Sequence, residues 1–551
     1  MDCEANIKEL KESLKRKPDL ILSSAYSNTR RQLAMIYLNK GEEIEGIYHL
    51  TESHGIGLRQ TSIAQSARSA DSFPYCDYLS FHKGYAKDES KGMLQRLKEM
   101  PSEWTIVQIT REFDQKEVIK SRIAETSPVF RGFHLTRLPC GSELEIGSPV
   151  SVNREWPENA ESDILADFWK IKKHLGTSIS GGTSRLIRKL REEAALDIER
   201  YCREIGQTCL KEWLVLFLGT ICDHNISKRI RTKVDNVLNL KQGLTSRQRY
   251  LTYLLAEGVP HLSEDDLGFA LYQLFTEDST FQSKVEDVLL EINREISNLA
   301  TIRRNPVILI VDEHLDMIPW ESLLLLRRHP ISRVPSLHFA HTLFKIHSKS
   351  IKNGLRELAS ADVCYYVLNP SGDLLPVEER LSKFIKKRFP SWIGIVGQKP
   401  TEEQLVEALT IGNAFIYCGH GSGCQYLAAD SISRLKVKPV QLLFGCSSVA
   451  LKDHGGSVEM TGDFLQFTVA GSGCTVGMLW PVTSRDIDKM TLILANIWLP
   501  GDPIDTETLN RADNIKKEPE LLRALVEVRK VPELFSNGAG FVARGIPIKI
   551  V

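Results

Sequence analysis

Two short runs of this chain end in side chains that could do chemistry together. Residues 414–418 and 440–444 are apolar and β-prone, and each is followed by glycine and a reactive side chain, His420 in one case and Cys446 in the other. An imidazole can act as a base or as a cationic partner, and a thiol that loses its proton is a strong nucleophile. The pair therefore predicts the catalytic residues of a cysteine peptidase.

This prediction rests on the pair, because either residue alone would more often be structural. A lone His420 fits a glycine-rich turn, and a lone Cys446 fits the small buried residue that a free cysteine usually is. The two residues are 26 positions apart, which leaves room for one crossover between two strands. Adjacent parallel strands place their carboxyl ends at one edge of a sheet, so we expect both side chains there.

The segment from residue 305 onward must position these two residues. Strand-like apolar runs alternate there with helical patterns, which is typical of an α/β fold with a mainly parallel sheet. The expected strands are residues 306–311, 363–368, 414–418, 440–444 and 475–480. The expected helices between them are residues 378–389, 402–409 and 461–470.

The residues before 305 follow a different pattern. Strands are expected at 104–110 and 129–138, and helical patterns occupy 161–175, 186–213 and the stretch from 267 to 296. We therefore expect three parts. These are a helical segment at 1–90, a second domain at 91–304 with few strands and a long helical insert, and the α/β domain at 305–551.

Composition excludes several classes of protein. Lys plus Arg equals Asp plus Glu at 70 each, so the zero net charge gives no sign of a nucleic-acid or membrane surface. The 11 cysteines show no paired metal-ligand spacing, which indicates a reducing compartment with no disulfide framework, metal site or cofactor. The charged first residues and the short apolar runs predict neither a signal peptide nor a membrane span. A soluble, intracellular protein is expected.

The motifs around His420 and Cys446 resemble the protease domain of separases, cysteine proteases of the caspase-like clan that cleave cohesin. The order of the pieces makes the resemblance specific. They are Asp312–Leu315, Pro319–Leu323, Ser332–Ser336, Tyr366–Leu374, Gly419–Gly423, Gly445–Ser448, Leu479–Trp480 and Asp486–Lys489. Weaker similarity reaches upstream, at Leu50–Ile56 with Arg59, Pro101–Thr105 and Leu196–Trp213.

The resemblance implies a caspase-like sheet flanked by helices. Before it would lie a pseudoprotease, or substrate, domain with a helical insert and a short helical N-terminal segment. Separases usually carry a far longer helical N-terminal region. The resemblance therefore implies that a separate helical subunit replaces it.

The resemblance also implies roles for individual residues. Cys446 would attack the scissile carbonyl, His420 would protonate the leaving amine, and the N–H groups of Gly421 and Cys446 would form the oxyanion hole. Separases cut after Arg, with an acidic residue three positions earlier. A pocket for Arg needs carboxylates, because a guanidinium pairs best with a planar acceptor.

The residues expected to line this pocket are Trp480 and the two carboxylates that follow it, Asp486 and Asp488. Two other positions depart from the usual separase pattern, because this chain has Pro481 and Ser484 where separases carry acids. The alternative for Asp486 and Asp488 is that they are helix N-terminal acids, which the helix dipole favours.

As a separase, the chain would cleave the kleisin subunit of cohesin at anaphase, bind a securin-like inhibitor, and occur in cytoplasm and nucleus. A second interpretation is a caspase-like peptidase of the CHAT type with another protein substrate. A third is an inactive scaffold with a protease fold. Inactive members usually lose the His or the Cys, and both are present here as His420 and Cys446.

Overall fold

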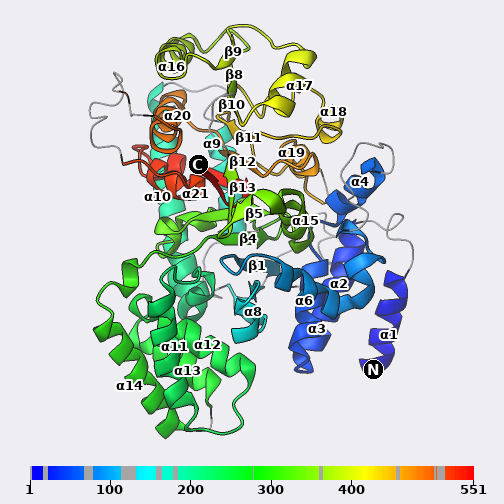
Figure 1. Ribbon diagram of the computed structural model, residues 1–551, viewed down its shortest axis with the longest axis vertical. Coiled ribbons are helices and arrows are strands. Elements are labelled where there is room, and N and C mark those ends of the chain that lie inside the picture. Colours follow the sequence, from blue (N-terminus) through cyan, green and yellow to red (C-terminus); the bar gives the residue numbers. More distant parts are fainter. Residues whose placement is uncertain are drawn as a thin grey trace.

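A computed structural model describes residues 3–15, 23–66, 78–112, 132–156, 164–177, 184–276, 278–358, 364–454, 459–501, 504 and 516–551. Within these ranges, eleven strands form one sheet that runs through the molecule (Figure 1). In spatial order the strands are β3 (Val150–Glu155), β2 (Gly132–Pro139), β1 (Thr105–Arg111), β4 (Val307–Val311), β5 (Ile331–Val334), β13 (Phe541–Gly545), β12 (Cys474–Met478), β11 (Val440–Leu443), β10 (Ala414–Cys418), β8 (Cys364–Leu368) and β9 (Ile393–Val396).

The sheet is mainly parallel. The pairings β2–β3, β1–β2 and β12–β13 are antiparallel, and the other neighbouring strands run parallel. A small second sheet contains β14 (Ile548–Ile550), β7 (Leu355–Leu358) and β6 (Ile351–Lys352). The expected α/β class with a mainly parallel sheet flanked by helices is confirmed.

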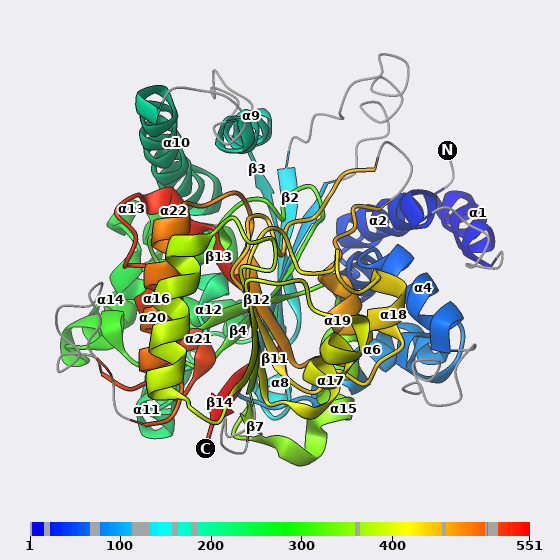
Figure 2. The same cartoon turned by 90° about the horizontal axis from the view of Figure 1, so that it is seen from above.

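Helices cover both faces of the α/β half of the sheet, as Figure 2 shows from above. One face carries α16 (Leu375–Arg388), α20 (Ser484–Trp498), α21 (Leu521–Val528) and α22 (Phe535–Ala539). The other face carries α15 (Leu337–His347), α17 (Glu402–Ile411), α18 (Ala429–Ser433) and α19 (Leu465–Val469). Because both faces are covered, the central strands can be apolar throughout.

Strand β4 illustrates this packing. Its sequence is a continuous apolar run that is buried along its whole length. Ile308 and Ile310 pack with Ile47 and Met93 in the core beneath the N-terminal helices, while Leu309 belongs to the larger core on the opposite face. Successive side chains of a strand point to opposite faces, so β4 joins two cores.

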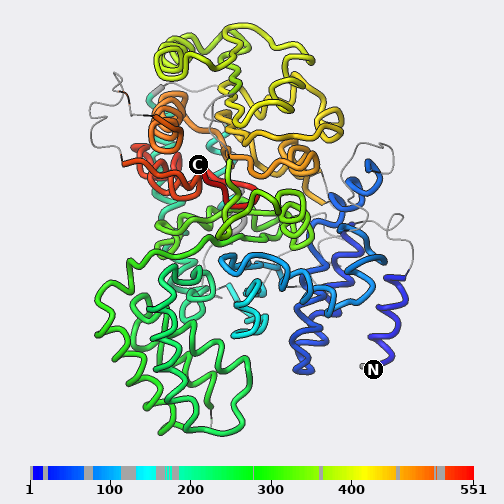
Figure 3. The backbone as a smooth tube through the Cα atoms, viewed as in Figure 1, coloured from blue at the N-terminus to red at the C-terminus, as the bar shows by residue number. Residues whose placement is uncertain are grey.

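Two groups of helices lie on opposite sides of the β1–β4 end of the sheet, as the trace in Figure 3 shows. The N-terminal group contains α1 (Cys3–Leu14), α2 (Ser23–Asn39), α3 (Glu43–Glu52), α4 (Ile56–Ser66) and α6 (Glu89–Glu99). The other contains α11 (His224–Leu238), α12 (Ser246–Gly258), α13 (Glu264–Leu274) and α14 (Ser279–Glu295). Further α-helices in the described ranges are α8 (Glu143–Ile146), α9 (Ile164–Thr177) and α10 (Ser184–Glu204).

Short helical turns complete the structure. A π-helix at Ile205–Leu210 and a 3₁₀ turn at Lys211–Phe217 continue the chain beyond α10. The expected helix at 186–213 is therefore α-helical only to Glu204. Other 3₁₀ turns are Gly84–Asp88, Val259–His261, Leu299–Thr301, Trp320–Ser322, Leu326–Arg328 and Ser348–Ser350.

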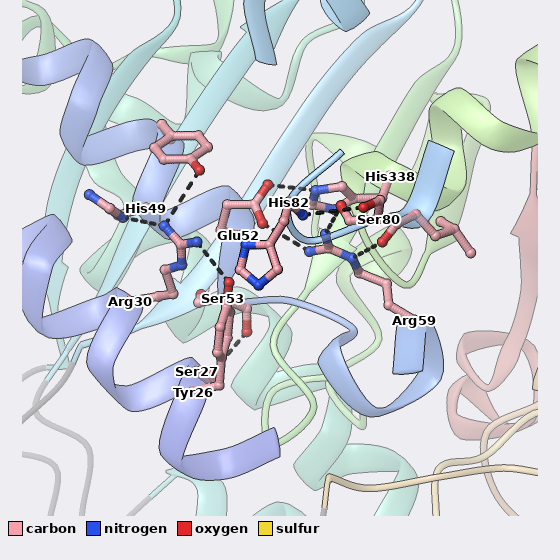
Figure 4. A network of polar contacts seen from close by, with 12 residues as sticks. Tyr26, Ser27, Arg30, His49, Glu52, Ser53, Arg59, Ser80, His82 and His338 are labelled. Atoms are coloured by element: carbon pink, nitrogen blue, oxygen red, sulfur yellow. Dashed lines mark hydrogen bonds and ion pairs between the residues drawn. The ribbon is translucent and has the colours of Figure 1, made fainter. Parts of the chain in front are cut away.

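A buried polar network ties the N-terminal helices to α15 (Figure 4). Arg59 of α4 donates from Nη1 to Oε2 of Glu52 (3.0 Å), and His338 of α15 donates from Nε2 to Oε1 of the same carboxylate (2.7 Å). Burial lowers the pKa of His338 to about 3, with Arg59 acting in the same direction. The imidazole is therefore neutral at neutral pH, and the network is a paired, buried link between three helices.

The sheet continues upstream of residue 305, because β1 pairs with β4 in parallel register. The three-part division at residues 90 and 304 stays a prediction. The described N-terminal segment is helical, and α19 is shorter than the helix expected at 461–470. Sequence reasoning missed β5, β13, α11 and α12. In the described part of the chain, no helix combines the length and apolarity needed to span a membrane.

Candidate active site

The structure brings the predicted His and Cys to one edge of the sheet. Strands β10 and β11 are parallel neighbours, with Ala414 opposite Val440 in the ladder. His420 follows the end of β10 by two residues, and Cys446 follows the end of β11 by three. Both therefore lie at the carboxyl ends of adjacent strands, where parallel sheets place ligands.

The two turns that carry these residues touch through their backbones. A Cβ atom added to Gly445 would lie 1.9 Å from the carbonyl oxygen of Gly421 and 2.8 Å from that of Gly419. Both distances are shorter than any ordinary Cβ contact, so only glycine fits at position 445. The glycines that flank His420 and Cys446 thus allow their loops to approach each other.

The backbone takes the left-handed conformation shortly after each of three neighbouring strands. Asn369 after β8 has φ of 50°, Gly421 after β10 has 66°, and Ser447 after β11 has 54°. Glycine adopts this conformation freely, but serine does so at a cost, and such strain concentrates at functional sites. The turn at Ser447 directs the chain away from β11 immediately after Cys446.

His420 is held by its backbone and by a carboxylate. Tyr417 donates its hydroxyl to the carbonyl oxygen of His420 (2.7 Å), and Gln425 donates to that same oxygen (2.8 Å). The imidazole donates from Nε2 to Oδ2 of Asp373 (2.9 Å), and this bond lowers the pKa of Asp373. The pair is surface-exposed. Because the bond to Asp373 uses Nε2, it orients the ring and leaves Nδ1 for another partner.

Cys446 is a partly exposed thiol at this edge. Its Sγ donates to the carbonyl oxygen of Val482 (3.6 Å). Burial raises the pKa of Cys424 to about 11 and of Cys474 to about 12, and it raises the pKa of Cys418 further. These three thiols therefore stay protonated at neutral pH. Cys446 is the candidate nucleophile because it follows β11 at the edge of the sheet where His420 follows β10.

Two backbone N–H groups are placed near the candidate nucleophile. Within the described part of the chain, neither the N–H of Gly421 nor that of Cys446 donates to a backbone carbonyl. Both groups lie on the touching turns. Their use as an oxyanion hole stays a prediction.

Asp486 lies in the first turn of α20, as the helix-terminus alternative predicts. Its backbone N–H donates to the Thr483 hydroxyl (3.2 Å). Its Oδ2 accepts from the Thr483 hydroxyl (2.7 Å) and from Nδ2 of Asn537 in α22 (2.6 Å). The carboxylate is thus held in place at the start of the helix.

Asp488 is bound within the protein. Its side chain is 1% exposed, and Arg380 of α16 donates to Oδ2 from Nε (2.9 Å) and also from Nη2. Burial raises the pKa of Asp488, and Arg380 opposes that shift. A substrate guanidinium would have to displace Arg380, so the geometry favours Asp486 over Asp488 as the pocket acid.

Trp480 lies in the core. It is 3% exposed, its indole N–H donates to the carbonyl oxygen of Ser536 (3.0 Å), and the ring packs against Gly540. The backbone carbonyl of Trp480 accepts from Ser447 (3.3 Å). Trp480 therefore supports the turn beside Cys446. Its contact with a substrate stays a prediction.

Arg191 of α10 is a further charged residue at this site. The helix packs against α22 (Figure 2). Asn537 of α22 holds Asp486. Arg191 is on the same helical face as the buried Ala194 and Ile198, three and seven residues later. Burial lowers the pKa of Arg191, whereas the charges of Cys446 and Asp486 raise it. Its guanidinium is thus within electrostatic reach of both residues.

Sequence reasoning missed Asp373 and Arg191 as site residues. A signal existed for Asp373, because this acid follows a third strand-like run, as His420 and Cys446 follow theirs. No signal existed for Arg191, which is one of several basic residues on a charged helix. The described residues contain no group of three or more His, Cys, Asp or Glu that could hold a metal ion.

The sequence matches one protein-family model over a range that contains this site. The model described as "Separin, protease domain" matches residues 188–487, which is more than half of the chain. The matched range includes His420, Cys446, Asp373 and Asp486.

Curated relatives agree with this match. The separin of Mus musculus is 32% identical over 270 residues, which cover 48% of this chain and 12% of that protein. The separin of Emericella nidulans is 26% identical over 464 residues, which cover 77% of this chain and 22% of the relative. The chain thus spans less than a quarter of the length of either relative.

A solved structure shares the fold. A crystal structure of the Saccharomyces cerevisiae separase–securin complex matches with a TM-score of 0.72 at 20% identity. The match covers all of this chain and 38% of the yeast chain.

Proposed function

The chain belongs to the separin family, and we propose that it is a cysteine endopeptidase of the separase type with Cys446 as its nucleophile. One observation carries the proposal. The turn around His420 and the turn before Cys446 are in backbone contact at the ends of two parallel strands. This arrangement suits a thiol that acts together with an imidazole.

In the proposed reaction, the Cys446 thiolate attacks the carbonyl carbon of the scissile peptide. The N–H groups of Gly421 and Cys446 donate to the oxyanion that forms. His420 gives a proton to the leaving amine, which breaks the C–N bond, and then takes a proton from the water that hydrolyses the acyl-enzyme. Asp373 acts as a positioning residue because its carboxylate accepts from His420 Nε2.

The proposed substrate class is a peptide cut after Arg, with an acid three positions earlier, and the proposed protein substrate is the kleisin subunit of cohesin at anaphase. Asp486 supports the Arg preference, because its carboxylate is fixed at the start of α20 by Thr483 and Asn537. Asp488 and Trp480 belong to the same proposed pocket, with Asp488 held by Arg380.

The proposed inhibitor is a securin-like protein, which the yeast relative carries in its complex. A separate helical subunit would supply the region that longer separases carry in their own chain. Cytoplasm and nucleus are the proposed locations. These proposals rest on the family, since the chain spans a minor part of its relatives.

A second candidate is a caspase-like peptidase of the CHAT type with a different specificity. Arg191 favours it, because a cation near Asp486 opposes the entry of a substrate Arg. Pro481 and Ser484 favour it as well, because both lack the charge that acids would supply there.

A thiol-reactive peptide probe that presents Arg before the reactive group tests the proposal. The parent protein should be labelled at Cys446, and C446S should not be labelled. The control C222S removes an exposed thiol and should be labelled at Cys446 like the parent. Labelling by a probe with Asp or a neutral residue instead of Arg would favour the CHAT-type enzyme. Failure of every probe to label Cys446 would favour an inactive scaffold.

A further inference from the structure

A cavity of about 130 Å³ lies between the N-terminal helices and the sheet. Neither His420 nor Cys446 lines it. Its wall mixes polar and apolar side chains, and its contributors include the start of α2, the start of α4, the end of β4 and the segment that begins at Glu459. The volume is comparable with the roughly 150 Å³ cavity that admits benzene in another protein, so a phosphate-sized ion fits.

Two helices begin at this cavity. Ser23 and Ser24 start α2, which is 17 residues long, and Gly57 is in the first turn of α4, which is 11 residues long. The first N–H groups of a helix have no partner within the helix, and its dipole places about half a positive charge there. The two helix ends thus form a concave surface that favours an anion.

Arg31 supplies a second, independent sign of an anion site. Its side chain is 5% exposed and lines the cavity, and its Nη2 donates to Oδ2 of Asp312 (2.7 Å). Nε and Nη1 of Arg31 have no hydrogen-bond partner among the described residues. Arg111 lies 3.6 Å from the same Asp312 carboxylate.

The charges around the cavity balance without Glu459. Arg31 and Arg111 offset Asp312 and Glu313, and Arg333 and Arg544 offset Asp316 and Glu321. The two helix ends then add about one positive charge in total. The site therefore has the charge to hold one anionic group.

The present occupant is the chain's own Glu459. Its Oε2 accepts from the N–H of Gly57 (2.6 Å), and its own N–H donates to the Ser23 hydroxyl (3.3 Å). A Cβ on Gly57 would lie 2.9 Å from this Oε2, so the glycine admits the carboxylate. Burial and Glu313 raise the pKa of Glu459 to about 7, so this carboxyl group is partly protonated at neutral pH.

We propose that the starts of α2 and α4, together with Arg31, form an exchangeable oxyanion site. Glu459 is its resident ligand, and a phosphate-sized oxyanion binds when the Glu459 carboxylate leaves. This oxyanion site is separate from the proposed peptidase residues, but the backbone links the segment of Glu459 to the segment that follows Cys446. Thr461 exchanges two backbone hydrogen bonds with Lys452 (2.6 and 3.2 Å), which is six residues after Cys446.

The test measures the binding of inorganic phosphate to parent, E459A and E459Q. Binding is followed by the thermal midpoint and by hydrogen–deuterium exchange at the Gly57 and Leu58 amides, at constant ionic strength kept with chloride. The control is E402A, because Glu402 also lies in the first turn of a helix but is exposed. E459A should lose protection at Gly57 and should regain it in phosphate, with at least tenfold tighter phosphate binding than the parent.

E459Q keeps the shape of the residue, so it reports on the site even if E459A fails to fold. It should bind phosphate at least threefold more tightly than the parent, because the amide carries no competing charge. Equal phosphate effects in the parent, E402A and both Glu459 variants would indicate an adventitious ion only. That result, or no binding to either Glu459 variant, would overturn the proposal.

Discussion

The backbone of Gly445 lies against the carbonyl oxygen of Gly421, at a distance that leaves no room for a side chain. This contact joins the turn before Cys446 to the turn after His420. The relative position of the candidate nucleophile and base is therefore fixed by main-chain packing between two loops.

We expect G445A to disable the site. The added methyl group would meet the Gly421 and Gly419 carbonyl oxygens, and relief of such overpacking costs about 1–3 kcal/mol or displaces a loop. Peptidase activity should fall by at least a hundredfold, and the thermal midpoint should drop. The matched control is G268A in α13, where a Cβ has no neighbour within 4 Å and should stabilise the helix by up to about 1 kcal/mol. Full activity in G445A would show that the two loops move independently.

D373N tests the positioning role of Asp373. The amide cannot replace the charge that accepts from His420 Nε2, but the pair is exposed and screened by water. We expect kcat/KM to fall about threefold to fivefold with little change in KM and no change in thermal midpoint. D430N is the control, since Asp430 forms an equally exposed pair with Arg434. A loss larger than a hundredfold would mean that Asp373 does more than orient the ring.

Peptides that differ only in the residue before the cut distinguish Asp486 from Asp488. D486N should reduce the preference for Arg over Lys, because a carboxylate can pair with two parallel N–H groups of a guanidinium. D488N should lower stability by about 1–3 kcal/mol and leave the preference unchanged, because it leaves the half-buried Arg380 without its partner. If both variants keep the Arg preference of the parent, a different carboxylate binds the substrate Arg.

R191A should improve the binding of substrates with Arg before the cut. The charge of Asp486 raises the pKa of Arg191, so the two groups attract each other and Arg191 would compete with a substrate guanidinium for this carboxylate. We expect KM for such peptides to fall about threefold to tenfold while kcat changes little. R188A is the control on the same helix, because Arg188 is 81% exposed and pairs with Glu192. A rise of KM in R191A would show that Arg191 assists binding.

Stability should decrease as the pH is lowered from about 6.5. The unfolded chain binds protons on histidine near pH 6.5, whereas the folded protein keeps His338 neutral down to a pKa of about 3. Between these values the unfolded state holds more protons, so each such histidine costs up to about 1.4 kcal/mol per pH unit. The thermal midpoint of H338Q should fall less steeply between pH 7 and 5 than that of the parent. The exposed His454 provides the control H454Q, whose slope should match the parent.

In the α/β half, several of the strands that sequence patterns predicted have unbroken apolar runs. β4, β8 and β10 are buried on both faces, so their sequences carry the full signal of a parallel strand. β5 and β13 escaped notice because each contains an arginine, Arg333 and Arg544. Both arginines are buried and pair with Asp316, a partner that only the folded chain brings close.

The same limit applies to the candidate site. His420 and Cys446 are recognisable because each follows its own strand within a glycine-rich turn. Asp373 and Arg191 come from other elements, and their relation to the pair depends on which strands and helices become neighbours. The ion pair between Arg380 and Asp488 likewise depends on the packing of α16 against α20.

The continuous ladder between β1 and β4 has a consequence for any attempt to isolate the catalytic half. A fragment that begins at residue 305 would lack β1, so β4 would become an outer strand with a row of unpaired N–H and C=O groups. The core that contains Ile308 and Ile310 would also lose Ile47 and Met93. Such a fragment is a template for edge-to-edge association between molecules. The candidate chemistry and the upstream strands therefore need to be produced as one chain.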